Sequence, residues 1–316
     1  MSTRGRPAWY KPDMGLAARM VLTMVLLGAI YVIFAGVLRY FLHASWIVLA
    51  VIAAGIAGVQ FFFADKIALA SMGAKIVSEQ EAPELHDLIG RLAAQANLPK
   101  PRVAYVDTQI PNAFATGRDK NHAVVAVTSR LYDNLSRPEL EAVLAHELTH
   151  IINRDMLVMT IATFFSMVAS LIVQNFFWFG GGFGGGYGRR SNDGEGNFAI
   201  VLLASVITYV LSFLLIRALS RYRELAADRG SALITGAPEH LATALVSIDE
   251  MIRGPQGARI PQRDFRQAQA ASALFIAPAI RGESLQTVFS THPSLQERLD
   301  QLQRIQAQME HGQGGY

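Results

Sequence analysis

Apolar and polar positions form long alternating blocks along this chain of 316 residues. Four apolar blocks carry no charged residue, and they cover residues 20–38, 44–64, 156–179 and 198–216. Each is about 19 to 24 residues long, and a helix needs roughly 20 apolar residues to cross the hydrocarbon core of a bilayer. The pattern therefore predicts four transmembrane helices, arranged as two hairpins.

The first block has an alternative interpretation as a cleaved signal peptide, because basic residues precede it at Arg4, Arg6, Lys11 and Arg19. Its apolar run is longer than the roughly 7 to 15 residues of a signal sequence, and the second block follows after about five residues. We therefore expect an uncleaved membrane anchor.

The distribution of Lys and Arg predicts the orientation in the membrane. These residues are more frequent before the first block and after the second and fourth blocks than in the two connections between paired blocks. The N-terminus and both large polar segments are therefore expected in the cytoplasm. The turn 39–43 and the glycine-rich segment 180–197, which we expect to be a flexible connector, would face outward.

The polar segments 65–155 and 217–316 have the composition of a soluble domain, which the second hairpin, 156–216, interrupts. Residues 1–64 form the first hairpin. Apolar periodicity predicts amphipathic helices at 83–96, from His240 onward and at 294–306. Ser136 with Glu139 is a capping-box signature that opens another helix. Short runs rich in Val and Ala predict strands, at 102–107, 112–116 and 123–128.

Composition excludes several classes of function. Charged residues make up 17% of the chain, which is below the roughly 25% of soluble domains. The net charge of +3 is spread along the chain, so nothing indicates nucleic-acid binding. The chain has no cysteine, which excludes thiolate catalysis and Cys-ligated zinc. A metal site must therefore be built from His, Asp and Glu.

The candidate chemistry lies on the helix that Ser136 opens, in the sequence His146-Glu147-Leu148-Thr149-His150. Residues four apart share one helical face, so both imidazoles can reach one metal ion. Glu147 is displaced by about 100° and can take a proton from a water molecule that zinc acidifies. The alternative is a helix with two incidental histidines. The motif favours a zinc hydrolase.

A catalytic zinc has three protein ligands and an open position. Glu224 is the best third candidate, because an antiparallel membrane hairpin returns it to the side on which His150 lies. Asp228, four residues later on the same face, could accept the ring N–H of a zinc-bound histidine. The alternative is that Glu224 and Asp228 pair with Arg221 and Arg223 on a solvated face.

The chain resembles the HtpX-type membrane zinc metalloproteases, which are gluzincins related to the prenyl-protein (CAAX) endoproteases. The resemblance rests on the two leading spans, the second hairpin and four motifs, which are PNAFATG at 111–117, HELTHIINRD at 146–155, SRYRELAADRG at 220–230 and THPSLQERL at 291–299. It implies that His146, His150 and Glu224 bind zinc and that Glu147 is the general base. It also implies quality control of membrane proteins, on the cytoplasmic face of the bacterial inner membrane.

The resemblance extends to three further features of the site. The residues that resemble the edge strand, with which an extended substrate could pair, are Asn112, Ala113, Phe114 and Ala115. His292 could donate to the oxyanion that forms at the scissile carbonyl, and Asn153 could support the site. The alternatives are a plain structural strand, a helix-capping His292 and a surface Asn153.

We therefore expect a mainly α membrane protein with four transmembrane helices and a small zincin-type α+β cytoplasmic domain. It would hydrolyse peptide bonds in misfolded or damaged membrane proteins, with the lipid bilayer and these substrates as its partners. Two His and one carboxylate beside an open position favour Zn²⁺ over other divalent ions. The alternatives are a prenyl-protein endoprotease, whose enclosed chamber needs more spans, and a non-catalytic zinc-stabilised scaffold that binds partners through the glycine-rich segment.

Overall fold

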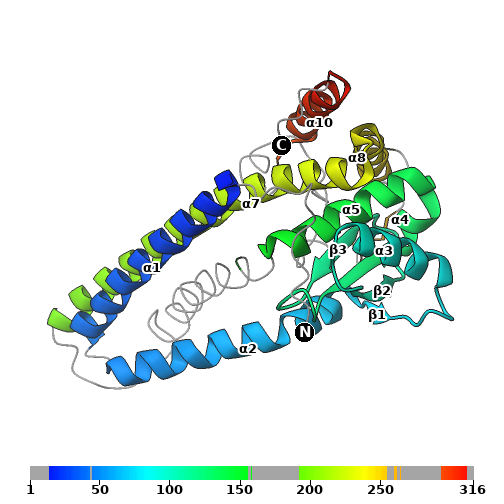
Figure 1. The fold of residues 1–316 in the computed structure, drawn as a ribbon. Helices are drawn as coiled ribbons and strands as arrows, with labels where there is room; N and C mark the ends of the chain where they lie inside the picture. Colours follow the sequence, from blue (N-terminus) through cyan, green and yellow to red (C-terminus); the bar gives the residue numbers. More distant parts are fainter. Residues whose placement is uncertain are drawn as a thin grey trace. The chain divides into compact units, whose positions relative to one another are not determined.

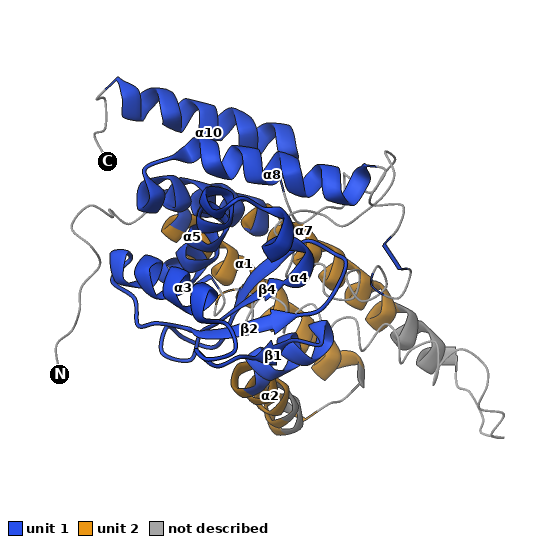
Figure 2. Cartoon of the chain, turned by 90° about the vertical axis from the view of Figure 1, so that its right-hand side faces the viewer, with its two compact units in different colours: residues 1–16, 63–157, 220–316 blue, residues 17–62, 158–219 orange. Residues whose placement is uncertain are grey.

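The computed structural model describes residues 14–42, 45–155, 158, 192–254, 260–261, 264 and 293–311. The chain divides into two compact units, which Figure 2 draws in different colours. Residues 17–62 and 158–219 form the helical unit, whereas residues 1–16, 63–157 and 220–316 form the α+β unit. The predicted division of the chain at residues 64, 155 and 216 stays a prediction.

Long apolar helices make up the helical unit, and they run on into the α+β unit. They are α1 (Met14–Leu42), α2 (Trp46–Met72) and α7 (Asn192–Thr235), and all three have stretches long and apolar enough to cross a membrane (Figure 1). In the helical unit, Leu27 packs with Ile216, and Phe34 with Val201, so α1 and α7 pair antiparallel. Many other apolar side chains of these helices are exposed, which suits contact with lipid.

Three of the four predicted apolar blocks lie in these helices, which are long and apolar enough to cross a membrane. The third, 156–179, lies outside the described residues except for Val158. The predicted end of the glycine-rich connector at residue 197 is wrong, because α7 already begins at Asn192. Once an apolar segment has nucleated a helix, each added residue gains one backbone hydrogen bond, so the helix extends into the polar flank. Residues 180–191 lie outside the described part of the chain.

The α+β unit contains a four-stranded mixed sheet in the order β1-β2-β4-β3. Its strands are β1 (Lys75–Ile76), β2 (Arg102–Val106), β3 (Ala113–Thr116) and β4 (Val124–Thr128). β2 and β4 are parallel, and both outer strands are antiparallel to their neighbours. Every residue of β4 is buried, which is why this strand is a continuous run of small and β-branched residues. β3 is an edge strand.

Helices cover one face of this sheet. They are α3 (Pro83–Gln95), α5 (Arg137–Asn153) and α8 (Pro238–Arg253), which share a core with Val103, Val125 and Val127. On the opposite face the end of α2 packs against Phe114 and Ala126. The other helices among the described residues of this unit are α4 (Ser129–Asn134) and α10 (Leu295–Glu310). The helices and strands that periodicity predicts in the polar segments are thus confirmed, whereas β1 and α4 were not predicted.

Candidate metal centre

Helix α5 carries two of the predicted metal ligands, His146 and His150, inside the α+β unit. The predicted capping box is confirmed, since Ser136 and Glu139 form both of its hydrogen bonds. Every residue from Ala142 to Ile152 is buried. The rings of His146 and His150 share a face of α5, with centroids 4.9 Å apart. Because the two histidines lie together on a buried helix, the structure favours a metal site over two incidental surface histidines.

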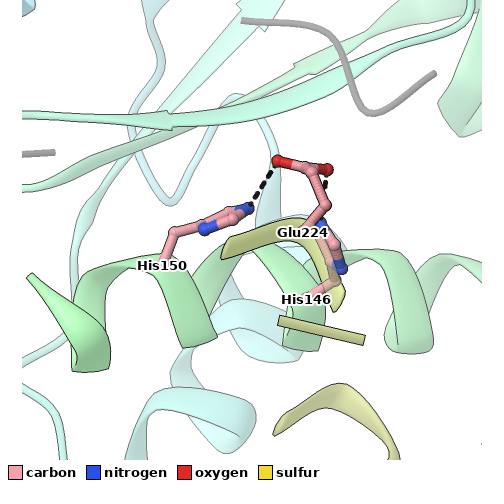
Figure 3. A group of neighbouring side chains, drawn as sticks. All are labelled: His146, His150 and Glu224. Atoms are coloured by element: carbon pink, nitrogen blue, oxygen red, sulfur yellow. Dashed lines mark ion pairs between the residues drawn. The ribbon is translucent and has the colours of Figure 1, made fainter. Parts of the chain in front are cut away.

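Helix α7 places Glu224 between these two histidines (Figure 3). Its Oε2 lies 3.6 Å from His146 Nε2, and its Oε1 lies 3.5 Å from His150 Nε2. One candidate ligand atom from each of the three residues lies within 4.8 Å of the others, a spacing that one bound ion can bridge. Glu224 is 5% exposed and Asp228 is fully buried, so the alternative of a solvated face is wrong.

Gly230 allows α7 to approach α5 closely enough for this arrangement. A Cβ atom on Gly230 would lie 2.5 Å from Thr149 Oγ1 and would also overlap its methyl group. About two turns away along α5, Ser231 Oγ donates to the backbone oxygen of Ala142 at 2.7 Å. The absence of a side chain at Gly230 therefore sets the spacing of the two helices that carry the three candidate ligands.

Gly230→Ala is accordingly expected to lower the free energy of unfolding by about 1–3 kcal/mol, because the added methyl group overpacks the helix contact. It should also weaken metal binding by moving Glu224 away from the histidines. Chemical denaturation and zinc titration measure the two effects. Gly90→Ala in α3 is the matched control, because its Cβ would meet only the Lys100 side chain at 3.7 Å. Equal stability of the two variants would show that Gly230 does not set the spacing.

Each histidine is held at its other ring nitrogen by a buried carboxylate. His146 Nδ1 lies 2.9 Å from Asp228 Oδ1, and His150 Nδ1 lies 2.7 Å from Asp155 Oδ2. His146 Nε2 is buried and has no hydrogen-bond partner among the described residues. This geometry fixes the tautomer with the proton on Nδ1 and leaves Nε2 of each ring for a metal ion.

Sequence reasoning proposed Asp228 as a partner of a histidine but missed Asp155. Asp155 reaches His150 because Arg154 adopts a left-handed conformation, with φ 59°, that ends α5 and turns the chain back. The only signal in the sequence is an acidic residue five positions after His150 in the HELTHIINRD motif.

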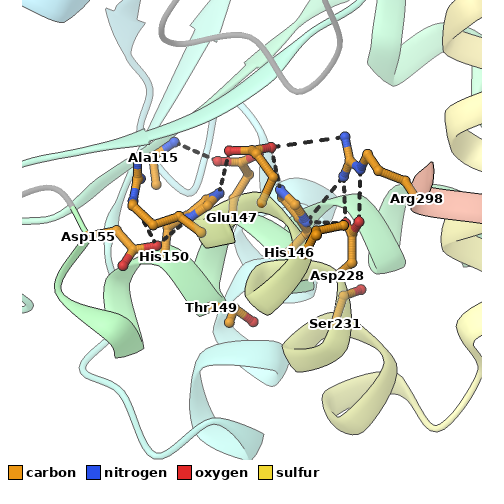
Figure 4. Close-up of polar contacts among 12 residues, drawn as sticks. Ala115, His146, Glu147, Thr149, His150, Asp155, Asp228, Ser231 and Arg298 are labelled. Atoms are coloured by element: carbon orange, nitrogen blue, oxygen red, sulfur yellow. Dashed lines mark hydrogen bonds and ion pairs between the residues drawn. The ribbon is translucent and has the colours of Figure 1, made fainter. Parts of the chain in front are cut away.

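Two buried arginines complete the polar network around the histidines. Arg298 donates from Nε and Nη2 to the two oxygens of Asp228 at 2.8 and 2.5 Å (Figure 4). Arg223 Nε lies 3.2 Å from Asp155 Oδ2. Together with Glu147 and Glu224, four carboxylates and two guanidinium groups surround the two histidines. The carboxylates outnumber the guanidinium groups, and a divalent cation between the histidines would offset the difference, so the residues present fit a metal ion.

The carboxylates around His146 raise its proton affinity, whereas the nearby guanidinium group of Arg298 lowers it. Burial alone lowers the pKa of His146, but the neighbouring carboxylates of Asp228 and Glu224 outweigh burial and raise the pKa to about 9. The position between the histidines therefore favours a positive charge, whether a proton or a metal ion supplies it. Burial raises the pKa of Glu147, which lies on the adjacent face of α5.

Glu147 connects this centre to the edge strand. Its Oε2 accepts a hydrogen bond from the backbone N–H of Ala115 in β3 at 2.9 Å. Next to β3, Asn112 exchanges hydrogen bonds with Thr128, whose side chain accepts and whose N–H donates. In an antiparallel pair the main-chain groups of alternate residues point away from the partner strand, so those of Ala113 and Ala115 point away from β4, to an edge with which no other described strand pairs.

Two predicted site residues remain, His292 and Asn153. His292 lies outside the described residues. Asn153 is the last residue of α5 and is half-buried. Its supporting role stays a prediction.

Long apolar helices together with a buried His-His-Glu group beside an edge strand define a membrane metalloprotease. A sequence model of peptidase family M48 matches residues 79–306, and the chain belongs to this family. The matched region contains every residue of the network around the histidines.

The chain is also similar to individual proteases along most of its length. It is 56% identical to a protease HtpX homologue of Moorella thermoacetica, with 94% of this chain and 97% of that protein covered. It is 50% identical to a second HtpX homologue, from Methanosarcina acetivorans, with 95% and 98% covered. Among solved structures, Ste24p of S. mikatae matches with 18% identity and a TM-score of 0.49, over 92% of this chain and 66% of that one.

Proposed function

We propose that this metalloprotease is a zinc-dependent endopeptidase with a zincin-type catalytic domain. His146, His150 and Glu224 would hold the zinc ion, and Glu147 would be the general base. The observation that carries the proposal is the convergence of three buried ligand atoms within 4.8 Å, with the adjacent Glu147 reaching the edge strand. Two imidazoles and one carboxylate with an open position favour zinc over harder divalent ions.

When bound, zinc supplies Lewis-acid chemistry, polarising the scissile carbonyl and acidifying a water molecule. Glu147 would take the proton from that water as it attacks the carbonyl carbon, and would deliver it to the leaving nitrogen. Its buried environment suits this role, because a carboxylate with a raised pKa holds a transferred proton more readily. Asp228 and Asp155 would keep His146 and His150 oriented throughout.

Substrate would bind as an added strand on the free edge of β3. Ala113 and Ala115 would offer main-chain groups to an extended peptide, and the peptide bond to be cleaved would then lie beside Glu147. Only an unfolded segment can pair in this way. Helices α2 and α7 continue from apolar stretches into the α+β unit and tether it to the membrane, so misfolded or damaged membrane proteins are the substrates that we propose.

The decisive experiment is cleavage of casein, an unfolded protein, by the full chain purified in detergent. Chelation is expected to abolish cleavage, and stoichiometric Zn²⁺ should restore it, whereas Mg²⁺ should not. Cleavage that survives complete chelation would contradict the proposal. A farnesylated peptide that is cleaved faster than casein would favour the prenyl-protein endoprotease instead.

We also propose that the protein lies in the cytoplasmic (inner) membrane with its N-terminus and catalytic site inside the cell. The chain has no cysteine, so single-cysteine variants report topology without background. In bacterial spheroplasts, a membrane-impermeant maleimide should label Ser45→Cys, between the first two spans. It should label Lys120→Cys, on the exposed surface of the α+β unit, only after lysis. The reverse pattern would invert the orientation.

A further inference from the structure

Arg298 is a charged side chain that the α+β unit buries almost completely, with 2% of its surface exposed. Two of its nitrogens donate to the two oxygens of Asp228, and Nη1 lies 4.0 Å from Glu224 Oε2. Its Nη2 also lies 3.5 Å from His146 Nδ1. A buried guanidinium is unfavourable unless it is fully paired, so this side chain is held at the metal centre by specific partners.

Helix α10, which carries Arg298, is attached to the segment of α7 that carries Glu224 and Asp228. Arg221 of α7 donates to Glu297 at 2.6 Å, and Gln301 donates to the backbone oxygen of Leu225 at 2.6 Å. Arg298 lies between these two α10 residues and reaches further inward. The C-terminal helix therefore contributes one side chain to the metal centre and two contacts that hold it there.

The same arrangement occurs at the second histidine with residues from different elements. His150 contacts Asp155, and Asp155 contacts the buried Arg223 of α7. At each histidine, a carboxylate contacts the ring and an arginine contacts that carboxylate. The two arginines come from different helices, α10 and α7. The pair of a carboxylate and an arginine occurs at both histidines, although different helices supply the arginines. This indicates that the pair has a role at the metal centre.

The planar fork of an arginine fixes the orientation of a carboxylate that it binds at both oxygens. With Arg298 in place, Oδ1 of Asp228 stays directed at His146 Nδ1. Without the fork, the carboxylate could rotate about its Cβ–Cγ bond, and His146 would lose the contact that keeps its Nε2 available to a metal ion.

We propose that Arg298 is a positioning residue that acts through Asp228 to hold His146 ready for the metal, so that docking of α10 and binding of the metal stabilise each other. The inference rests on the proposed zinc site. The coupling is reciprocal: if docking of α10 strengthens metal binding by a given free energy, metal binding stabilises the docked helix by the same free energy.

The test measures zinc affinity of the full chain in detergent by competition with a chromophoric chelator. Arg298→Gln is expected to weaken binding by about 10- to 100-fold, the range of residues that orient metal ligands. Arg298→Lys, which keeps the charge but loses the fork, should recover only part of this loss. Arg304→Gln, at an exposed position of the same helix, is the control and should bind zinc like the wild type.

A double-mutant cycle separates positioning from general stabilisation of the fold. If Arg298 acts through Asp228, then the Asp228→Asn, Arg298→Gln double variant should bind zinc no more weakly than Asp228→Asn alone. The double variant also removes the unpaired buried carboxylate that could unfold Arg298→Gln. Additive losses would overturn the proposal, as would wild-type affinity in both Arg298 single variants.

Hydrogen exchange in α10 supplies a readout that does not depend on activity. Zinc should slow exchange at residues 295–310 less in Arg298→Lys than in the wild type, and equal slowing in both would overturn the coupling. His150→Ala separates this inference from the proposed function. If His150→Ala binds zinc like the wild type, the zinc site itself is wrong. If it loses zinc while the Arg298 variants keep it, only the role of Arg298 fails.

Discussion

Glu147→Gln is expected to abolish peptide hydrolysis and to leave the metal bound. The substitution keeps the size of the side chain and an oxygen that can accept the Ala115 N–H, so the buried helix and the edge strand should keep their structure. It removes the only group on α5 beside the histidines that can take a proton from water. General-base catalysis contributes about 10²–10⁴-fold, and turnover should fall by at least that factor.

Casein turnover and metal content of the purified chain, measured on the same sample, check this prediction. Glu141→Gln is the matched control, because Glu141 lies on the same helix but is partly exposed and pairs with Arg91. It should keep full activity and full metal content. Turnover of Glu147→Gln within tenfold of the wild type would show that another residue is the general base. Loss of the metal would show that Glu147 is a ligand.

Glu224→Ala is expected to yield a protein that does not retain zinc and does not hydrolyse peptides. Two imidazoles alone leave the ion with one protein ligand fewer than the three of known catalytic sites. The carboxylate also supplies one of the negative charges that a divalent ion balances between His146 and His150. Zinc content by mass spectrometry and casein turnover measure both losses.

Thermal unfolding provides an independent measure of the same substitution. A ligand present at 100 times its dissociation constant stabilises the folded state by about 2.7 kcal/mol, so zinc should raise the Tm of the wild type. It should leave the Tm of Glu224→Ala unchanged. Glu239→Ala, at an exposed position of α8, is the control and should respond to zinc like the wild type. A full zinc complement in Glu224→Ala would exclude Glu224 as a ligand.

Local sequence patterns were sufficient for the features that depend on neighbouring residues. The apolar blocks predicted α1, α2 and the apolar part of α7, because length and absence of charge are properties of a continuous segment. The capping box at Ser136 predicted the start of α5, and the spacing of His146 and His150 predicted their shared face. The run of small and β-branched residues predicted β4, which both faces of the sheet bury.

The partners of the histidines required the tertiary structure. The hairpin argument selected Glu224 as the third candidate ligand, but its place between the rings depends on the close helix contact at Gly230. Asp155 depends on the left-handed turn at Arg154, and Arg298 on the docking of α10 against α7. No local pattern marks Asp155 and Arg298 as parts of the site.

The sequence by itself thus determined which segments are helical, which are apolar enough for a membrane, and which helix carries the paired histidines. Glu224 and Asp228 were candidates from the sequence, but only the tertiary structure decided how they, Asp155 and the two arginines are placed around the histidines. The physical reason is that helical periodicity and capping act over a few residues of the chain. The distances among α5, α7 and α10, in contrast, are set by the packing of side chains that are far apart in sequence.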